Sequence, residues 1–596
     1  MILPLLIAGW TVVGADGAAR APVILADTNR DGVVTMADAD DKAVWTSQRG
    51  AILLPNIGDS AKRCSDVSNP NITDAQLEAC NDAEGDVARA PDYFAPVMTL
   101  PTQGASNSAS GQVAAIGPGA EKIRVFIQRK GKWAYVGPND RLSAKEVREG
   151  ARFGVDSRDV VRDAAVWDGR VTLRFTVSDR GQTSHDQVAM RVAPVLVHNH
   201  LEKAVDVFAP ESGKWEPHKT FISDLSTALK SAGFQGRLRQ IPTRDIWAQD
   251  FVEFGYVSMP APGGSKVLRI AIRSPQPTRS AGRALFTLRG PDMGVVQLGG
   301  AGYHQTDSFG NLETVPPYEH NGKRYPVGRV IYGDAADGVA PHRDMTTFFT
   351  AQQDQAPIML DTSWLIIGHV DEFVQFLPAD TPRGWTIAVK DVASGLALLR
   401  DAQRRGFGAT KAFSRPDAPQ QTIDEVLADK AFLEDNELGR RRVELNLDLL
   451  KAETGITESE VVRVPGLFHT AEFAASLPKA RQHEASAPPQ DAPPPPVDDN
   501  LPLMAEAITY GPGSLIAFYP AAVNGLLLDR KNYLPPQQWG PVIDGQDILQ
   551  VAVEKAYASV GIKAWSIDDW LSHHSWGGEV HCGTNATRTI SADWWR

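Results

Sequence analysis

Alternating hydrophobic and polar residues run through the first third of the chain, from about residue 22 to 197. The segment "RVTLRFTVSD" (170–179) is hydrophobic at every second position, as in a strand with one buried face. "KIRVFIQRKGKWAYV" (122–136) alternates in the same way and turns at Lys130 and Gly131, which predicts a hairpin. "DQVAMRVAPVLV" (186–197) alternates again. Several short strands with turn residues between them favour a β-sandwich.

From about residue 198 to 596 the pattern changes to strands interleaved with helices. We expect strands in "KVLRIAIRS" (266–274), "GRVIYG" (328–333) and "SWLIIGHVDEFVQFLP" (363–378). Helical spacing of hydrophobic residues marks "TIDEVLADKAF" (422–432), "RRRVELNLDLLKAETG" (440–455) and "DILQVAVEKAYASVG" (547–561). This part is therefore predicted to be an α/β domain. Its proline-rich tract, 483–499, favours an extended surface loop rather than a packed segment.

Composition narrows the class of protein. A chain of 596 residues is expected to hold two or three domains. Its net charge of −12 argues against a nucleic-acid partner and suits cationic ligands. No internal run reaches the roughly 18 apolar residues of a membrane-spanning helix. Residues 1–21 resemble the remnant of a signal peptide, although a buried first strand fits them as well.

The three cysteines bear on where the protein resides. Cys64 and Cys80 flank a polar, loop-like segment, and a disulfide between them would suit a secreted protein. Cys582 would then be the single free thiol. These features favour secretion, and a cytoplasmic location stays open.

Three short stretches carry residues suited to chemistry. They are "DIWAQD" (245–250), "GHVDEF" (368–373) and "GEVHC" (578–582). In a strand, the spacing of His369 and Asp371 would point both side chains to one face. Cys582 with a histidine alone would suggest a thiol protease, which needs only one carboxylate or amide to orient the base. Two carboxylates, Asp250 and Asp371, suggest instead that the substrate is a cation such as a guanidinium.

These stretches, with "DSFGNLE" (307–313), "GPVIDG" (540–545) and "GEVHCGTN" (578–585) in this order, resemble the catalytic domain of the protein-arginine deiminases. The similarity runs from about residue 194 to 596. It implies a pentein fold, a five-fold pseudo-symmetric α/β propeller, preceded by an immunoglobulin-like β-sandwich. It also implies hydrolysis of arginine residues in proteins or peptides to citrulline, with release of ammonia.

The resemblance also assigns roles to individual residues. Cys582 matches the nucleophile, which would carry a covalent thiouronium intermediate, and His369 matches the general acid and base. Asp250 and Asp371 match the carboxylates that hold the guanidinium. Trp247 matches the ring beside the apolar stem of the substrate arginine.

Two positions depart from the pattern of the animal members. Trp576 stands where they have an arginine that contacts the substrate backbone, and Arg279 is shifted from the position of a second one. The way in which a peptide is held is therefore open, and free arginine or a small guanidine compound such as agmatine is an alternative substrate. An alternative of another class is a non-catalytic secreted calcium-binding module.

Calcium is the cofactor that the resemblance implies. One family calcium site is matched completely, by Gln249, Glu253, Glu313 and the backbone carbonyls of Phe309 and Leu312. A second family site requires oxygen ligands where this chain has Phe251 and Arg273, so we expect that site to be empty.

A separate candidate calcium loop lies near the N-terminus, in "DTNRDGVVTMAD" (27–38). Its oxygen-bearing residues Asp27, Asn29, Asp31 and Asp38 fall at positions 1, 3, 5 and 12 of an EF-hand or dockerin-like loop. Position 12 is Asp rather than the usual Glu. We favour metal binding here over a simple acidic turn.

Overall fold

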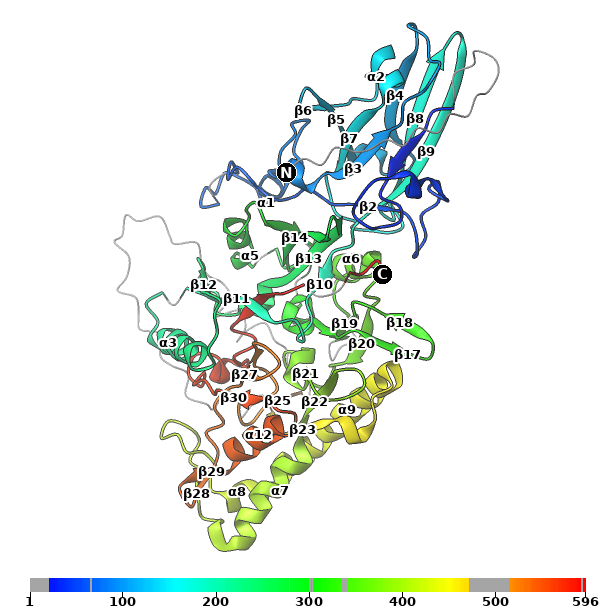
Figure 1. Ribbon diagram of the computed structural model, residues 1–596. Helices are drawn as coiled ribbons and strands as arrows, with labels where there is room; N and C mark the ends of the chain where they lie inside the picture. The colour runs from blue at the N-terminus through cyan, green and yellow to red at the C-terminus, as the bar shows by residue number, and fades with distance from the viewer. Residues whose placement is uncertain are drawn as a thin grey trace, which may run out of the picture.

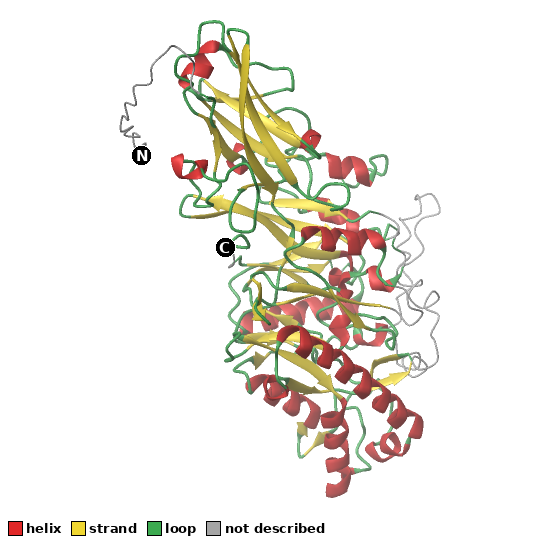
Figure 2. Ribbon diagram, turned by 90° about the vertical axis from the view of Figure 1, so that its right-hand side faces the viewer, coloured by secondary structure: helices red, strands yellow, loops and turns green. Residues whose placement is uncertain are grey.

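The computed structural model describes residues 21–64, 67–211, 213–277, 279–299, 302, 304–334, 340–470, 514–590 and 593–596. The candidate signal peptide and the proline-rich tract 483–499 lie outside these residues, apart from residue 21. Figure 1 shows an elongated molecule, with a β-rich part at one end and a larger α/β part at the other. Nearly all of the helix belongs to the α/β part (Figure 2).

Two sheets face each other in the β-rich part. One has the order β1 (Ile24–Ala26), β3 (Ala95–Thr99), β7 (Ala151–Ser157), β5 (Ile123–Arg129) and β6 (Lys132–Tyr135). The other has the order β2 (Ala51–Leu53), β9 (Gln182–Val192), β8 (Arg170–Asp179) and β4 (Ser110–Ile116). Their inward side chains, such as Val125 and Phe175, share one core, because each strand alternates between a buried and a solvated face. The hairpin predicted at Lys130 and Gly131 joins β5 to β6.

The α/β part repeats one arrangement of strands. In the described residues, five sheets each contain an antiparallel pair whose second strand runs parallel to a third strand. Listed in that order, the strands are β31 (Asn585–Arg588), β11 (Ala204–Pro210) and β12 (Leu238–Ile241); β13 (Val252–Ala261), β14 (Gly264–Arg273) and β15 (Met293–Gln297); β16 (Glu313–Val315), β19 (Arg329–Asp334) and β20 (Ile358–Asp361); β21 (Val374–Pro378), β22 (Trp385–Asp391) and β23 (Val462–Pro465); β26 (Leu526–Leu527), β27 (Asn532–Leu534) and β30 (Lys563–Ala564). The short strand β10 (Leu196–Val197) adds to the edge of β13.

Helices connect the parallel strands of each sheet, as a parallel pair requires a crossover. They are α3 (Glu216–Ser231); α5 (Ala281–Ala284); α6 (Arg343–Gln352); α7 (Val392–Ala402), α8 (Ile423–Ala428) and α9 (Lys430–Thr454); and α12 (Ile548–Ala558). Two short helices, α1 (Asp74–Ala79) and α2 (Ala144–Glu149), belong to the β-rich part. Although α9 has 25 residues, no helix in the described part of the chain is both long and apolar enough to cross a membrane.

The helices predicted at 440–455 and 547–561 are present, and so are the strands predicted at 266–274 and 328–333. The helix predicted at 422–432 is interrupted, because α8 ends at Ala428 and Asp429 caps the start of α9. The strand predicted over 363–378 is wrong in its first half. Only Val374–Pro378 forms a strand, and residues 370–372 form a short 3-10 helix (η7) capped by His369. The apolar residues 364–367 before His369 are buried, as expected, but they form a loop that crosses the core and not a strand. His369 and Asp371 are therefore not neighbours on one face of a strand.

Candidate active site

Five segments that lead into the first strands of the five sheets lie next to one another. They are α4 (Ala248–Phe251) before β13, η6 (Phe309–Asn311) before β16, η7 (Val370–Glu372) before β21, the turn at Asn524 before β26, and the turn at Cys582 before β31. α4 contacts η6, and η6 contacts η7. The Gln249 N–H donates to the Cys582 carbonyl at 3.0 Å, which closes the ring of segments. The predicted site residues, far apart in sequence, meet here.

Cys582 lies among polar groups and is almost fully buried. Its Sγ is 3.4 Å from Asn524 Oδ1 and 3.6 Å from Asp371 Oδ2. Burial raises the pKa of the Cys582 thiol well above its ordinary value, and the charges of Asp371 and Asp250 raise it further. Without a cation beside it, the thiol is therefore protonated at neutral pH.

Asp250 and Asp371 each have one carboxylate oxygen engaged and one without a partner. Arg279 Nη2 donates to Asp250 Oδ2 at 3.0 Å, and His581 Nδ1 lies 2.9 Å from Asp371 Oδ2. Oδ1 of both aspartates is buried and accepts no hydrogen bond from the described residues. Because leaving a buried carboxylate oxygen unsatisfied is costly, this arrangement indicates a place for a cationic donor.

His369 is held with one ring nitrogen toward the site. Its Nε2 lies 2.9 Å from the carbonyl of Gln305, and since a carbonyl only accepts, Nε2 carries the proton. Nδ1 faces Gly310, where an added Cβ would lie 2.3 Å from Nδ1 and 3.2 Å from Asp250 Oδ1. Glycine at this position thus lets His369 and Asp250 approach each other, and Nδ1 is the nitrogen available for proton transfer.

Aromatic rings form the wall beside the thiol. Trp247 and Ile246 pack against Cys582, and the partly exposed Trp215 and Trp576 extend the same cluster. The rings of Trp215 and Trp576 meet edge to face with their centroids 6.0 Å apart. A Cβ at Gly578 would lie 2.4 Å from the Trp247 ring, so this glycine allows the ring its position. The wall is suited to the apolar stem of a long side chain.

The oxygen groups matched to the family calcium site are gathered at one cavity of about 20 Å³. Gln249 Nε2 donates to Glu253 Oε2 at 2.6 Å and to the Phe309 carbonyl at 3.1 Å, and Leu312 and Glu313 line the same cavity. Burial, with repulsion from Glu313, raises the pKa of Glu253 to about 8. Burial, with repulsion from Asp371, raises the pKa of Glu313 to about 7 against the opposing effect of His581. Two buried carboxylates with raised pKa values facing one cavity fit a hard dication.

The residues of the second family calcium site are engaged otherwise. Phe251 is fully buried in an apolar core cluster, and Arg273 donates to Asp74 and, at 2.6 Å, to Gln297 Oε1. Arg279 is also buried and points toward Asp250 and Asp245 rather than outward. It is therefore not placed to contact a peptide backbone at the surface.

The candidate loop near the N-terminus is a compact acidic turn. Asp27 accepts backbone hydrogen bonds from Asp31 and Gly32, Asp38 accepts from Asn29, and Asn29 donates to Asp31. Burial, with the charges of Asp38 and Asp31, raises the pKa of Asp27 to about 6. A Cβ at Gly32 would meet the Ala261 backbone at the far end of β13 from Asp250. Calcium binding at this loop stays a prediction.

Several functional neighbours were not found from the sequence. Asn524 contacts both the N–H and the thiol of Cys582, and its amide donates to the Asp371 carbonyl at 3.3 Å. Its sequence context, Asn followed by Gly, is that of an ordinary turn. His200 and His581 both contact Glu313, and neither lies in a spacing of metal-ligating residues that would have identified it from the sequence.

Cys64 and Cys80 form a disulfide with their Cα atoms 5.6 Å apart, which leaves Cys582 as the free thiol.

Comparison with known proteins agrees with this arrangement. The chain is 29% identical to human protein-arginine deiminase type-4 over 96% of its own length and 82% of that protein. It is also 29% identical to the human type-1 enzyme, over 72% of this chain and 60% of that protein. A solved agmatine deiminase of C. jejuni matches with a TM-score of 0.33 and 11% identity, covering 66% of this chain and 96% of that one, a similarity too low to define the fold. The model of the protein-arginine deiminase (PAD) family matches residues 182–596, and the chain therefore belongs to this family.

Proposed function

We propose that this protein is a hydrolase that converts arginine residues of proteins or peptides to citrulline and releases ammonia. Its family membership carries the reaction class. The observation that carries the site is the pair of buried, unpartnered oxygens of Asp250 and Asp371 near the free thiol of Cys582. A guanidinium has the fork of N–H donors that both oxygens require, and its central carbon is the electrophile that a thiolate attacks.

The charges explain why the thiol becomes reactive only with substrate bound. Burial, with the charges of Asp371 and Asp250, raises the pKa of the Cys582 thiol and keeps it protonated in the free protein. A guanidinium between the two carboxylates offsets their field and favours the thiolate, and the proton of the thiol passes to His369 Nδ1, which gives the acid form of His369. The thiolate then attacks the central guanidinium carbon, and a C–S bond forms. Ammonia departs as the C–N bond breaks, taking a proton from the acid form of His369.

His369 then acts as a base in the second half of the reaction. Its free nitrogen, Nδ1, can accept a proton from a water that attacks the thiouronium carbon. The C–S bond breaks, the thiolate returns, and the ureido group of citrulline is left. Trp247, packed on Cys582, would hold the apolar stem of the arginine during both steps.

Calcium is proposed as the resident cation of the cavity between Gln249, Glu253 and Glu313. The residues fit it, because oxygen donors and two buried carboxylates face the cavity. When bound, calcium would neutralise these carboxylates. Gln249 and Asp250 are adjacent on α4, so fixing the Gln249 side chain would also fix the guanidinium clamp.

We further propose that residues 198–596 form the pentein propeller and residues 22–197 the immunoglobulin-like domain. Five sheets with one strand pattern, and site residues at the entry to each, support the first assignment. Two facing sheets with a shared core support the second. The disulfide Cys64–Cys80 suits an oxidising compartment and supports secretion.

The test is an assay of ammonia release and of ureido product, which is citrulline for the two arginine substrates, on an arginine peptide, free arginine and agmatine, each with calcium and with chelator. We expect calcium-dependent citrulline formation on the peptide and none with Cys582→Ser. Conversion of only the free amino acid or agmatine would replace the protein substrate by a small guanidine. Calcium binding by calorimetry without conversion of any of the three would support a non-catalytic calcium-binding module instead.

A further inference from the structure

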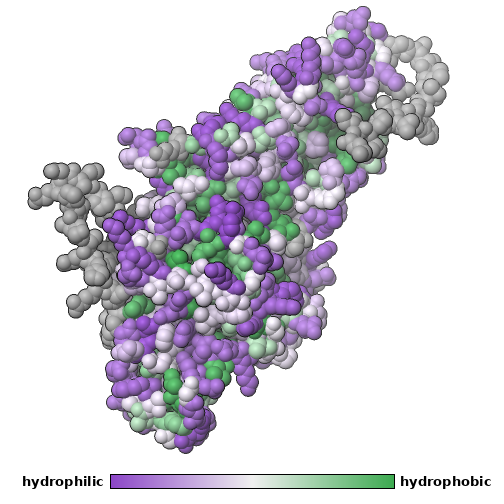
Figure 3. All heavy atoms as spheres, turned by 60° about the vertical axis from the view of Figure 1, so that its left-hand side comes forward, coloured by the Kyte–Doolittle hydropathy of each residue, from purple (hydrophilic) through white to green (hydrophobic). Residues whose placement is uncertain are grey.

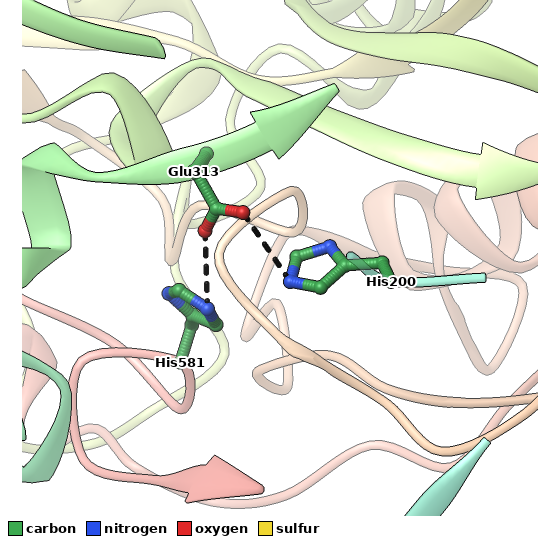
Figure 4. A group of neighbouring side chains, drawn as sticks. All are labelled: His200, Glu313 and His581. Carbon is green, nitrogen blue, oxygen red and sulfur yellow. Dashed lines mark ion pairs between the residues drawn. The ribbon is translucent and has the colours of Figure 1, made fainter. Parts of the chain in front are cut away.

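Two histidines and a glutamate from three distant parts of the chain face one another beside the candidate active site (Figure 4). His200 follows β10, Glu313 begins β16, and His581 precedes β31. His200 Nε2 lies 3.3 Å from Glu313 Oε2, and His581 Nε2 lies 3.2 Å from Glu313 Oε1. One ligand atom of each residue lies within 4.8 Å of the others, and all three side chains are buried.

This donor set differs from that of a calcium site. Calcium is bound by oxygen, whereas two imidazole nitrogens and one carboxylate oxygen are ligands of zinc and related transition metals. All three residues line the cavity of about 20 Å³, which is large enough for a single ion or water. The geometry therefore offers a second kind of cation a place beside the proposed calcium ligands.

The second nitrogen of His581 is held as in many metal-ligating histidines. His581 Nδ1 lies 2.9 Å from Asp371 Oδ2, so a carboxylate orients the ring while Nε2 faces Glu313 and the cavity. Nδ1 of His200 is buried and has no hydrogen-bond partner in the described residues.

The charges around the cavity also favour a dication. Arg588 is the cation that lines the described cavity, and its Nη1 is directed to the carbonyls of Glu202 and Leu527. Two carboxylates, those of Glu253 and Glu313, line the same cavity.

We propose that His200, Glu313 and His581 form a binding site for a zinc-class metal ion, which shares Glu313 with the proposed calcium site. The two cations then oppose each other, because they share a carboxylate and two dications repel in a buried cavity. Only the competition with calcium rests on the proposed function.

The experiment titrates the calcium-free protein with Co²⁺, whose visible absorption reports coordination by nitrogen and the number of ligands. We expect one bound ion with the intense spectrum of a four- or five-coordinate site. His200→Asn should weaken binding by about 10–100-fold or more, since the loss of a ligand costs at least as much as the loss of a residue behind one. His185→Asn, at an exposed histidine on β9, is the matched control and should bind as the wild type does.

Equal affinity of His200→Asn and the wild type would overturn the site, and so would a weak octahedral spectrum. X-ray absorption of the zinc-loaded wild type is a second measurement that needs no folded variant. It should report two imidazole ligands, and oxygen ligands alone would overturn the proposal. Calcium should lower the apparent affinity for Co²⁺, and an unchanged affinity would refute the sharing of Glu313. None of these readouts is activity, so failure of the deimination proposal would be seen separately.

Discussion

Arg279 donates from Nη2 to Oδ2 of Asp250 at 3.0 Å, with both side chains buried. Its Nε also donates to Asp245 Oδ2 at 2.7 Å, which fixes the guanidinium in place. Burial raises the pKa of Asp250, and the charge of Arg279 is the main opposing effect. Arg279 thus helps to keep Asp250 ionised while leaving Oδ1 open. The sequence suggested this arginine as a displaced contact for the substrate backbone, and the structure instead places it against one oxygen of Asp250.

Replacing Arg279 should change the pH dependence of the enzyme. In Arg279→Gln, Asp250 loses its cation, the neutral carboxyl is favoured, and its pKa rises further. The acidic limb of the profile of kcat/KM against pH should therefore move to higher pH. Arg283→Gln is the control, because Arg283 bonds Asp74 rather than Asp250, and its limb should stay in place. If the acidic limb of Arg279→Gln lay at the same pH as that of the wild type, the ionisation of Asp250 would not depend on its ion pair with Arg279.

Asp371→Asn should separate thiol reactivity from turnover. Removing a negative charge beside Cys582 lowers the pKa of its thiol, so more thiolate is present at a given pH. Alkylation by iodoacetamide should then reach half its maximal rate at a lower pH than in the wild type. Turnover should instead fall, because a buried guanidinium left partly unpaired costs about 3–5 kcal/mol.

Cys582→Ser is the control for the alkylation, since Cys64 and Cys80 are paired and this variant should take up no label. An alkylation midpoint at the same or a higher pH in Asp371→Asn would contradict the electrostatic role of this carboxylate. Wild-type turnover in the same variant would contradict its role in the clamp.

The sequence predicted which residues lie together at the site better than the local structure that carries them. Cys582, Asp250 and Asp371 are close together, as their residue types suggested. The strand expected at His369 is a 3-10 turn, because five loops meeting from separate sheets, and not one strand, bring the groups together. The hydrophobic periodicity of a single segment cannot predict that five segments from separate sheets come together. For the same reason Asn524 and His200 could not be predicted, since the contacts of Asn524 with Cys582 and Asp371 join segments 58 and 153 residues apart, and His200 meets Glu313 from a separate sheet.

Gly578→Ala should impair substrate binding through Trp247. The added Cβ would lie 2.4 Å from the ring, so the ring has to move from its place beside Cys582. A displaced wall should raise KM for an arginine peptide and lower kcat/KM by about a hundredfold, as for small displacements of other positioned groups. Gly264→Ala is the control because an added Cβ there meets no atom within 4 Å. Equal kcat/KM in Gly578→Ala and the wild type would show that the position of the ring does not matter.

The face of the molecule in Figure 3 is mostly hydrophilic, and hydrophobic residues show on it only in scattered groups.

Two buried carboxyl groups with raised pKa values, Glu253 and Glu313, make the stability of the fold depend on pH. Folding raises the pKa of Glu253 from 4.5 to about 8 and that of Glu313 from 4.5 to about 7. The folded, calcium-free protein therefore holds more protons than the unfolded chain in this range, and these two groups lower stability as pH rises from about 4.5 to 8.

The prediction is a fall in the free energy of unfolding across this range in chelator, and a smaller fall in saturating calcium. A fall remains because burial raises the pKa of Glu372, outside this cavity, to about 8. Calcium binds the ionised carboxylates and removes their repulsion, so the bound protein gains most at high pH. Denaturant unfolding at a series of pH values measures both curves. The double variant Glu253→Gln, Glu313→Gln should have a shallower decline in chelator and lose the effect of calcium at this cavity. A control pair at exposed positions, Glu121→Gln with Glu554→Gln, should keep the wild-type slope. The prediction would be wrong if, in chelator, the free energy of unfolding fell equally steeply with pH in the wild type and in the double variant. Ionisation of Glu253 and Glu313 would then not be what destabilises the fold.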